Sequence, residues 1–408
     1  MKRFFRMLAP ALLITLVLTG CRTRHDNYTV IVSLDGNRWD YPDLHDMPFF
    51  DSLSRVGVKA VMEPSFPAST FPNHYTMATG CVPDHNGMVH NSFRDPDTGE
   101  HYSMGDSSKR FNPKYYLKEP VWITAEKQGV TTANIYWLGG DVAIQGMYPT
   151  YWRNWNEQPH WDFEERVDEA VRLMSLPEKE RPRLMMVYFD EPDHTGHGFG
   201  PLSEETAVMA HEMDSLMHDF YLRLMKLPHA KKINFILAGD HGMTELSPER
   251  FVSWAEAVDP AWIEDIVGAS PTSIFCKEGY VDTVYNALCG IPHLNVYRHG
   301  QCPPELNYGT SDRLGDIIVS PDLGWQFNHK PSSNKASHGY APQELEMQVA
   351  FRAIGPDFKK GYEARPYEKG AYAAFKNIDL YPMLCYLLGI QPAPVDGDLN
   401  RIKQILKK

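Results

Sequence analysis

The chain has 408 residues, of which 43% are hydrophobic and 23% are charged, as in ordinary globular proteins. Its 52 acidic residues outnumber its 40 lysines and arginines, which gives a formal net charge of −12. This balance argues against a protein that coats nucleic acid with a basic surface. It is compatible with a small anionic substrate if metal ions supply local positive charge.

The N-terminus has the features of a targeting signal. A basic lead over residues 1–6 precedes an apolar run over residues 8–18, which is shorter than the roughly 20 residues of a membrane-spanning helix. The run ends in Leu-Thr-Gly-Cys21, which resembles a bacterial lipobox, where cleavage leaves Cys21 as an acylated N-terminus. We therefore predict a signal peptide over residues 1–21 and a tether over residues 22–27. The mature protein would be an exported lipoprotein, anchored to a membrane on its periplasmic or cell-surface side. The alternative is an ordinary secretory peptide with a chance cysteine.

The cysteines that follow Cys21 are few and scattered: Cys81, Cys276, Cys289, Cys302 and Cys385. Their spacing contains no C-x-x-C zinc motif and does not predict a disulfide scaffold. The sequence leaves their pairing open.

Four short apolar runs, rich in branched and aromatic side chains, each lead into a segment with acidic residues. They are Tyr28–Leu34, Thr131–Trp137, Leu184–Phe189 and Ile233–Ala238. Runs of this kind are typical of strands buried on both faces, and helical patterns over residues 161–175 and 203–226 separate the later ones. The alternation predicts an α/β fold with a doubly wound, mostly parallel sheet flanked by helices. Ligands of such sheets bind at the carboxyl ends of the strands.

The pattern loosens over residues 245–331, where prolines and glycines are frequent and only short strand-like pieces remain. We predict a small inserted α+β subdomain there. The sheet is expected to resume over residues 347–354, and a last amphipathic helix is expected over residues 378–388.

The segment Pro67-Ala-Ser-Thr-Phe-Pro-Asn-His-Tyr75 contains a candidate nucleophile, Thr70. Pro72 disfavours a helix interior, so we predict that Thr70 lies on a tight connection between regular elements. A threonine hydroxyl is a poor nucleophile at neutral pH and needs a base or a metal ion to activate it.

Acidic and histidine side chains that suit such a metal ion occur in four other places. They are Asp35, the pair Asp193 and His197, the pair Asp240 and His241, and His338. Asp193 and His197 lie four residues apart with Gly196 between them, so we expect a tight turn there that directs both side chains at one ion. Carboxylate and neutral imidazole are both ligands of zinc. A single acid after a strand is more often a helix cap or turn residue, but the joint pattern predicts a metal site.

Together these fragments resemble the nucleotide pyrophosphatase/phosphodiesterase family of the alkaline phosphatase superfamily. The resemblance covers nearly the whole chain after residue 28. It is carried by ordered motifs: Ser33-Leu-Asp-Gly, Thr70-Phe-Pro-Asn-His-Tyr, Asn91, Trp122-Ile-Thr-Ala, Glu191-Pro-Asp-His-Thr-Gly-His, Gly239-Asp-His-Gly-Met, His338-Gly-Tyr and Pro392-Ala-Pro. It implies an alkaline-phosphatase-like catalytic domain over residues 28–408.

The resemblance also implies a site with two zinc ions, for which another divalent metal is able to substitute. One ion would be held by Asp35, Thr70, Asp240 and His241, and the other by Asp193, His197 and His338. Thr70 would attack phosphorus and form a phosphothreonine intermediate, which water then hydrolyses. Asn91 and the backbone N–H of Thr70 would donate to a non-bridging phosphoryl oxygen.

The implied substrate is a small nucleotide-type phosphodiester or pyrophosphate. Monoesterases of the superfamily hold the second phosphate charge with an extra basic group, but Ser69 and Ser92 lie beside Thr70 and Asn91 here. The expected substrate-binding residues are Phe71, Trp155 and Tyr188, which would stack on a base, and Asp141. Asp141 lies in Trp137-Leu-Gly-Gly-Asp-Val142, where the family has Trp-Pro-Gly-Ser-Asp-Val, so the turn that shapes the pocket is expected to differ.

Several other functions compete with this hypothesis. A choline-type phosphodiesterase, a phosphomonoesterase or a phosphonate hydrolase would use the same metal site. A sulfatase would need an arginine in the motif that begins at Ser65, and none is present. A zinc-binding lipoprotein without catalysis would have no use for Thr70. The sequence leaves the oligomeric state open.

Overall fold

The computed structural model describes residues 26–407, so the predicted signal peptide, Cys21 and most of the predicted tether lie outside the described residues. The chain is built on a 9-stranded sheet. Its strands run in the order β18 (Tyr362–Glu363), β2 (Val58–Glu63), β17 (Val349–Ile354), β8 (Ile233–Ala238), β1 (Tyr28–Leu34), β7 (Leu184–Phe189), β5 (Thr132–Ile135) and β6 (Tyr151–Trp152), and β19 (Phe375–Lys376) pairs with β2.

The centre of this sheet is parallel. β1 pairs in parallel with β7 and with β8, and in these pairs Leu34 faces Phe189 and Ser33 faces Ala238. The three strands therefore end at the same edge of the sheet. Every residue in them is buried, which explains why their sequences are continuous apolar runs. β5 pairs in parallel with β6 and β7, and β18 and β19 pair in parallel with β2, whereas β17 is antiparallel to its neighbours β2 and β8. The predicted mostly parallel sheet is thereby confirmed.

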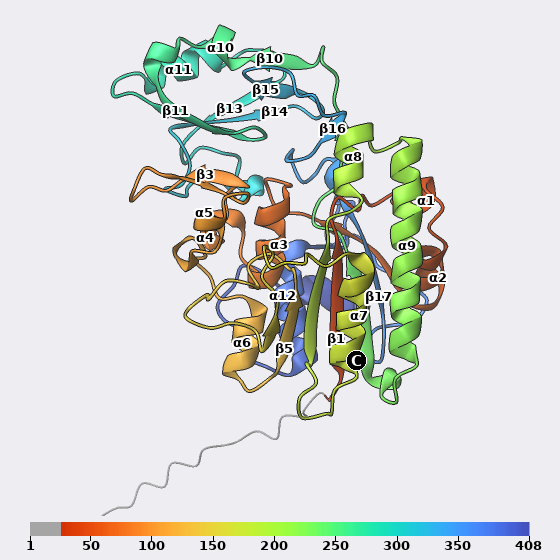
Figure 1. Ribbon diagram of the computed structural model, residues 1–408. Helices are drawn as coiled ribbons and strands as arrows, with labels where there is room; N and C mark the ends of the chain where they lie inside the picture. The colour runs from red at the N-terminus through yellow and green to blue at the C-terminus, as the bar shows by residue number, and fades with distance from the viewer. Residues whose placement is uncertain (1–25, 408) are drawn as a thin grey trace, which may run out of the picture.

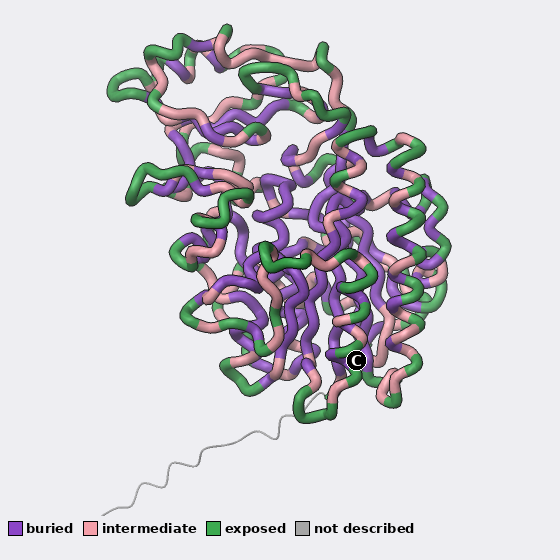
Figure 2. The backbone as a smooth tube through the Cα atoms, in the orientation of Figure 1, coloured by how far each residue is buried: buried purple, intermediate pink, exposed green. Residues whose placement is uncertain are grey.

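Helices flank the sheet in two groups (Figure 1). α9 (Glu204–Met225) contacts α2 (Pro48–Val56) and α7 (Phe163–Met174), and α12 (Leu380–Leu388) contacts α3 (Thr70–Thr79) and α6 (Val121–Lys127). α9 begins after Ser203, whose hydroxyl accepts the N–H of Thr206. Its apolar stripe is buried at Met213, Phe220 and Leu224. Figure 2 shows the buried residues concentrated along the sheet, with exposed residues on the outer faces of the helices.

A separate 4-stranded antiparallel sheet lies beyond the carboxyl edge of the main sheet (Figure 1). Its strands run in the order β11 (Ile263–Gly268), β12 (Thr272–Cys276), β14 (Ile317–Pro321) and β13 (Leu294–Arg298), and α11 (Val281–Leu288) contacts β13 and β14. This unit has its own hydrophobic cluster, which includes Ile274, Val284 and Phe327. All of these elements fall within residues 245–331.

Two local predictions were wrong. Thr70 is the first residue of helix α3 and does not lie on an irregular connection. Pro72 is tolerated because it lies in the first helical turn, where the backbone N–H groups have no intrahelical acceptor. The segment from Asp193 to His197 was expected to form a tight turn, but it forms most of a short helix, α8 (Asp193–Phe199). The four-residue spacing still places both side chains on one face.

The five cysteines of the described chain are all free thiols. Within residues 26–407, none of the helices combines the length and the apolar character that crossing a membrane requires.

Candidate metal and catalytic centre

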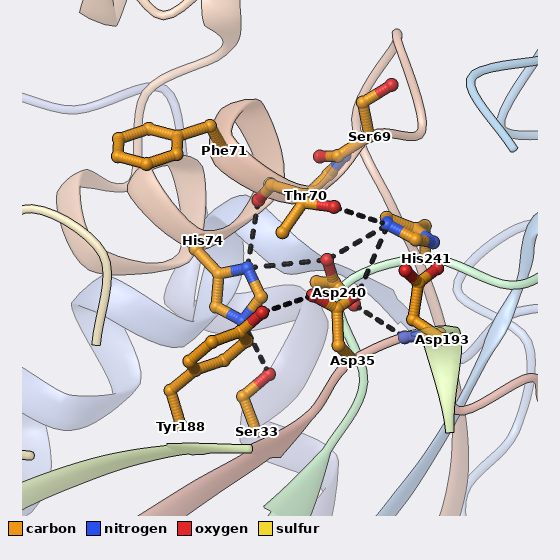
Figure 3. A network of polar contacts seen from close by, with 12 residues as sticks. Ser33, Asp35, Ser69, Thr70, Phe71, His74, Tyr188, Asp193, Asp240 and His241 are labelled. Carbon is orange, nitrogen blue, oxygen red and sulfur yellow. Dashed lines mark hydrogen bonds and ion pairs between the residues drawn. The ribbon is translucent and has the colours of Figure 1, made fainter. Parts of the chain in front are cut away.

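The polar residues that follow the central strands meet at the carboxyl edge of the sheet (Figure 3). Asp35 follows β1, and Asp240 and His241 follow β8. Asp193 begins helix α8, a few residues after β7. Because these three strands are adjacent and parallel, residues that are far apart in the sequence end side by side.

Two further segments complete this cluster. His338 follows the short strand β16 (Ala336–Ser337), and Thr70 begins α3. The Oγ1 atom of Thr70 lies 3.1 Å from Nε2 of His241, so the hydroxyl points at the cluster. Asn91 accepts the backbone N–H of Phe71 at 2.9 Å, which holds its amide against the first turn of α3.

The ligand atoms form two adjacent groups that share Asp193. Asp35, Asp193 and His241 each offer one atom within 4.8 Å of the others, and so do Asp193, His197 and His338. Nε2 of His241 is 3.3 Å from Asp35 Oδ1 and 3.2 Å from Asp240 Oδ2. The rings of His241 and His338 stack with their centroids 3.7 Å apart. The structure thus brings together all the residues that were expected to hold metal.

Gly36, which ends the Ser-Leu-Asp-Gly motif, allows this close approach. Its φ is +66°, and a Cβ atom built there would lie only 2.9 Å from Asp193. The N–H of Gly36 donates to Oδ1 of Asp240 at 3.1 Å. A side chain at this position would strain the backbone and displace Asp193.

The three carboxylates fit a site for cations. One oxygen of each group, namely Asp35 Oδ1, Asp193 Oδ1 and Asp240 Oδ2, is buried without a hydrogen-bond partner. A buried carboxylate oxygen without a donor is costly unless a cation or a proton compensates it. Unpartnered oxygens that gather beside imidazole nitrogens are the donor set that zinc prefers.

The histidines are oriented for the same purpose. Nδ1 of His197, His241 and His338 lies 2.9–3.1 Å from the backbone carbonyl oxygens of Ala336, Gly242 and Ala68, respectively. Since a carbonyl only accepts, each Nδ1 carries the proton and each Nε2 keeps its lone pair for a metal ion. Burial lowers the pKa of His197, and it lowers that of His338 further with the help of His241, which favours the neutral ligand form.

Burial and mutual repulsion alter the acidity of the carboxyl groups. Burial, together with the charges of Asp240 and Asp193, raises the pKa of Asp35 well above its usual value. Burial also raises the pKa of Asp193 to about 7, although the charge of His241 opposes the rise. Burial would raise the pKa of Asp240 as well, but His241 and His74 outweigh it and hold that pKa at about 2. The cluster therefore takes up protons when no cation balances its charge.

The expected substrate-binding residues have different surroundings. Oδ2 of Asp141 accepts the N–H of Trp155 at 3.0 Å, and the ring of Trp155 is half-buried. Phe71 has no exposed surface, because Tyr102, Tyr116 and the guanidinium group of Arg110 surround its ring. A base therefore has no free face of Phe71 to stack on in this structure.

Tyr188 also differs from the expectation. It is buried, and its hydroxyl donates to Asp35 Oδ2 at 2.6 Å. Its contact is with a carboxylate of the metal cluster, so the structure gives it a supporting position and leaves no ring face open to a substrate.

Sequence reasoning missed Arg110. Its guanidinium carbon lies 5.2 Å from the ring centre of Trp155 and 5.7 Å from that of Phe71, and Nη2 is 3.7 Å from Asp141 Oδ2. Arg110 thus joins three of the expected substrate-binding residues. Its only signal in the sequence is a cation before an aromatic residue, Phe111, which is too common to single out.

Comparison with known proteins agrees with this geometry. The profile of the family described as type I phosphodiesterase / nucleotide pyrophosphatase matches residues 29–341. The chain belongs to this family. The resemblance of the motifs and the α/β fold of the alkaline phosphatase superfamily are thereby confirmed.

Several members of the type I phosphodiesterase family are similar to this chain along most of the length of the chain. Family member 7 of the ectonucleotide pyrophosphatase/phosphodiesterases of Mus musculus is 31% identical over 412 residues, which cover 96% of this chain and 90% of that protein. Family member 1 of Homo sapiens is 32% identical over 398 residues, or 93% of this chain. The chain spans only 42% of the length of that human protein.

A solved structure of the family superimposes closely. It is an inactive threonine-to-alanine variant of murine ectonucleotide pyrophosphatase/phosphodiesterase 5 in complex with AMP. The TM-score is 0.85 at 29% sequence identity, and the match covers 93% of this chain and 100% of that one.

Without metal, the protein is expected to lose stability as the pH rises. The carboxyl group of Asp193 has a pKa of about 7 in the folded protein and about 4 in an unfolded chain. Its contribution to stability is therefore fully present below about pH 4 and is lost as the pH rises through about 7. Urea unfolding of the chelator-treated protein at pH 5 and pH 8 measures this loss. Asp193→Asn, which has no carboxyl group to ionise, should lose less over the same interval, and an equal loss would contradict the assignment.

Removal of the Tyr188 hydroxyl is expected to weaken zinc binding. Tyr188→Phe keeps the ring but removes the 2.6 Å hydrogen bond to Asp35. Loss of such outer partners typically weakens metal binding about 10- to 100-fold. Equilibrium zinc titration measures the change. Tyr381→Phe is the matched control, because that buried hydroxyl bonds Thr124 and not a carboxylate of the cluster. Wild-type affinity in Tyr188→Phe would show that the hydrogen bond has no supporting role.

Proposed function

We propose that this protein is a two-metal phosphodiesterase and pyrophosphatase that hydrolyses nucleotide-type substrates through a phosphothreonine intermediate. The observation that carries the proposal is the position of the Thr70 hydroxyl. It lies 3.1 Å from His241 Nε2, beside carboxylate oxygens that have no hydrogen-bond partner. Membership of the family supports the reaction class, and the relative solved with AMP supports a nucleotide substrate.

In this proposal the chain supplies the nucleophile and the metal ligands. Asp35, Asp240 and His241, with Thr70 itself, would hold one zinc ion, and Asp193, His197 and His338 would hold the other. When bound, the two ions would lower the pKa of the Thr70 hydroxyl and offset negative charge at the phosphoryl group. Thr70 Oγ1 forms the bond to phosphorus as the bond to the leaving oxygen breaks, and water then hydrolyses the phosphothreonine.

Asn91 has a position that suits a phosphoryl oxygen. Its amide oxygen is engaged by the N–H of Phe71, which leaves the amide nitrogen to donate beside Thr70. A donor of this kind is typically worth about 10²–10³ in rate.

The charges near Thr70 favour a diester over a monoester. Ser69 and Ser92 occupy the positions beside the nucleophile and Asn91, so neither position supplies a cation for a second phosphate charge. Arg110 lies on the aromatic side of the site, where Asp141 faces it. We further propose that Asp141, Trp155 and Arg110 line the nucleotide side of the substrate.

We retain two proposals about the whole chain. Residues 28–408 form one catalytic domain that carries the subdomain over residues 245–331. The protein is exported and anchored through Cys21, which would place the enzyme outside the cytoplasm.

The substrate class is tested with three nitrophenyl esters: a nucleotide diester, phosphorylcholine and the simple phosphate monoester. We expect the nucleotide diester to have the highest kcat/KM, and we expect a chelator to abolish all activity until zinc is restored. Faster turnover of the phosphorylcholine ester would identify a choline-type phosphodiesterase instead. Comparable turnover of the monoester would overturn the diesterase assignment.

The nucleophile is tested with Thr70→Ala. This variant is expected to lose turnover by several orders of magnitude, because no other hydroxyl replaces Oγ1, while it still binds most of its zinc. Thr79→Ala is the matched control at the other end of the same helix, since its hydroxyl donates to the carbonyl of Tyr75 within that helix. A fully active Thr70→Ala protein would refute the mechanism.

A further inference from the structure

His74 lies one helical turn after Thr70 in α3, and its side chain has no exposed surface. Its Nδ1 atom is 2.8 Å from the carbonyl oxygen of Thr70 and 3.3 Å from Oδ2 of Asp240. Its Nε2 atom is 2.8 Å from the hydroxyl of Ser33, in strand β1 (Figure 3). One imidazole therefore contacts the residue that carries the nucleophile, a carboxylate of the metal cluster and the central strand.

These neighbours fix which nitrogen of His74 carries the proton. A carbonyl oxygen and a carboxylate oxygen only accept hydrogen bonds, so both contacts of Nδ1 require the N–H to be there. The 2.8 Å contact with Thr70 is the hydrogen bond, whereas Oδ2 of Asp240, at 3.3 Å from Nδ1, lies beside the same N–H in an electrostatic contact that is not a hydrogen bond. The hydroxyl of Ser33 both donates and accepts, so it is able to donate to the lone pair of Nε2.

The ring is also held mechanically. It meets Trp137 edge-on at a centroid distance of 5.2 Å and Tyr188 at 4.9 Å. The indole N–H of Trp137 donates to the backbone carbonyl of His74 at 3.2 Å. Tyr188 donates to Asp35 and His74 lies beside Asp240, so these two packed rings contact two carboxylates of the cluster. Trp137, which packs against His74, belongs to the segment Trp137–Val142 that departs from the family motif.

We propose that His74 is a positioning residue whose Nδ1–H fixes the position of Asp240 relative to Thr70. It thereby couples the nucleophile to the zinc ion that Asp35, Asp240 and His241 would hold. It touches no reacting atom and acts only through those two residues. The inference rests on the proposed two-zinc site and adds to it a residue that fixes the relative positions of Asp240 and Thr70. Partners of this kind typically change metal affinity or activity about 10- to 100-fold.

The competing explanation is that His74 merely fills the core. Two substitutions separate the explanations, because an asparagine amide nitrogen occupies the place of Nδ1 and a glutamine amide nitrogen that of Nε2. His74→Asn thus keeps the proposed donor, and His74→Gln removes it from Asp240 and Thr70. Loss of packing alone would impair the smaller asparagine variant at least as much as the glutamine variant.

The experiment measures zinc affinity by equilibrium titration of chelator-treated protein, and it measures kcat and KM separately on the nitrophenyl nucleotide diester. For His74→Gln we expect zinc affinity and kcat each to fall about 10- to 100-fold, with KM changed by less than about 3-fold. His74→Asn should remain within about 5-fold of wild type in both. Equal impairment of the two variants, or native zinc affinity in His74→Gln, would overturn the proposal.

His45→Asn is the matched control. His45 is also a buried histidine, but its Nε2 atom contacts the carbonyl of Pro201 and no residue of the cluster. This variant should lower the free energy of unfolding without changing zinc affinity or kcat. If either His74 variant fails to fold, Ser33→Ala carries the test. It frees Nε2 and should weaken zinc binding by a few-fold, and an unchanged affinity would overturn the proposal.

The zinc titration also separates this inference from the proposed function. If wild-type protein binds two zinc ions but hydrolyses none of the esters, the function fails while the comparison of His74 variants still stands. If wild-type protein is an active diesterase and His74→Gln binds zinc normally, the role of His74 fails alone.

Discussion

The mutual repulsion of three clustered carboxylates is the constraint on which this structure depends. Asp35, Asp193 and Asp240 meet at the end of the parallel strands, and each has a buried oxygen without a hydrogen-bond donor. Isolated buried charges cost several kcal/mol each, even after the protein relaxes. Such a cluster persists only if protons or cations balance it. Without a cation, protons balance the charge, and the pKa of Asp35 and that of Asp193 are raised accordingly. When a cation is bound, the histidine Nε2 atoms directed at the same space would be its ligands.

The rest of the fold supplies what this cluster needs. Parallel strands deliver several chain segments to one edge, and the backbone carbonyls of Ala68, Gly242 and Ala336 orient the imidazoles. Thr70 begins a 10-residue helix, so its hydroxyl sits where free backbone N–H groups and the helix dipole favour negative charge. The nucleophile is thereby placed on a rigid element, beside the ligands that would activate it.

The sequence predicted the parts of the structure that depend on local pattern. β1, β7 and β8 agree with the expected bounds because strands buried on both faces need uninterrupted apolar residues. The expected ligands were identified from motifs that place acids and histidines after those strands and from the family resemblance, which adds His338 and Thr70. The predictions that failed concern features that depend on the position of a residue within an element or on its tertiary surroundings. Pro72 is harmless only because it lies in a first turn, and no local pattern shows that Arg110 and two tyrosines cover Phe71. Tyr188 has the residue type of a stacking surface, but its hydroxyl is used by a carboxylate 153 residues away.

Charge balance also connects the cluster to the substrate of the proposed enzyme. Two divalent cations held by three carboxylates would leave one net positive charge, and the site has little else to add to it. Ser69 and Ser92 provide no cation beside the nucleophile, and Arg110 is opposed by Asp141. A diester carries a single negative charge at phosphorus, which such a site neutralises. A monoester dianion would bring a second charge into a buried region where an unpaired charge is costly. The preference for diesters would then follow from the number of carboxylates that the sheet edge brings together, and the aromatic side of the site would determine which diester is bound.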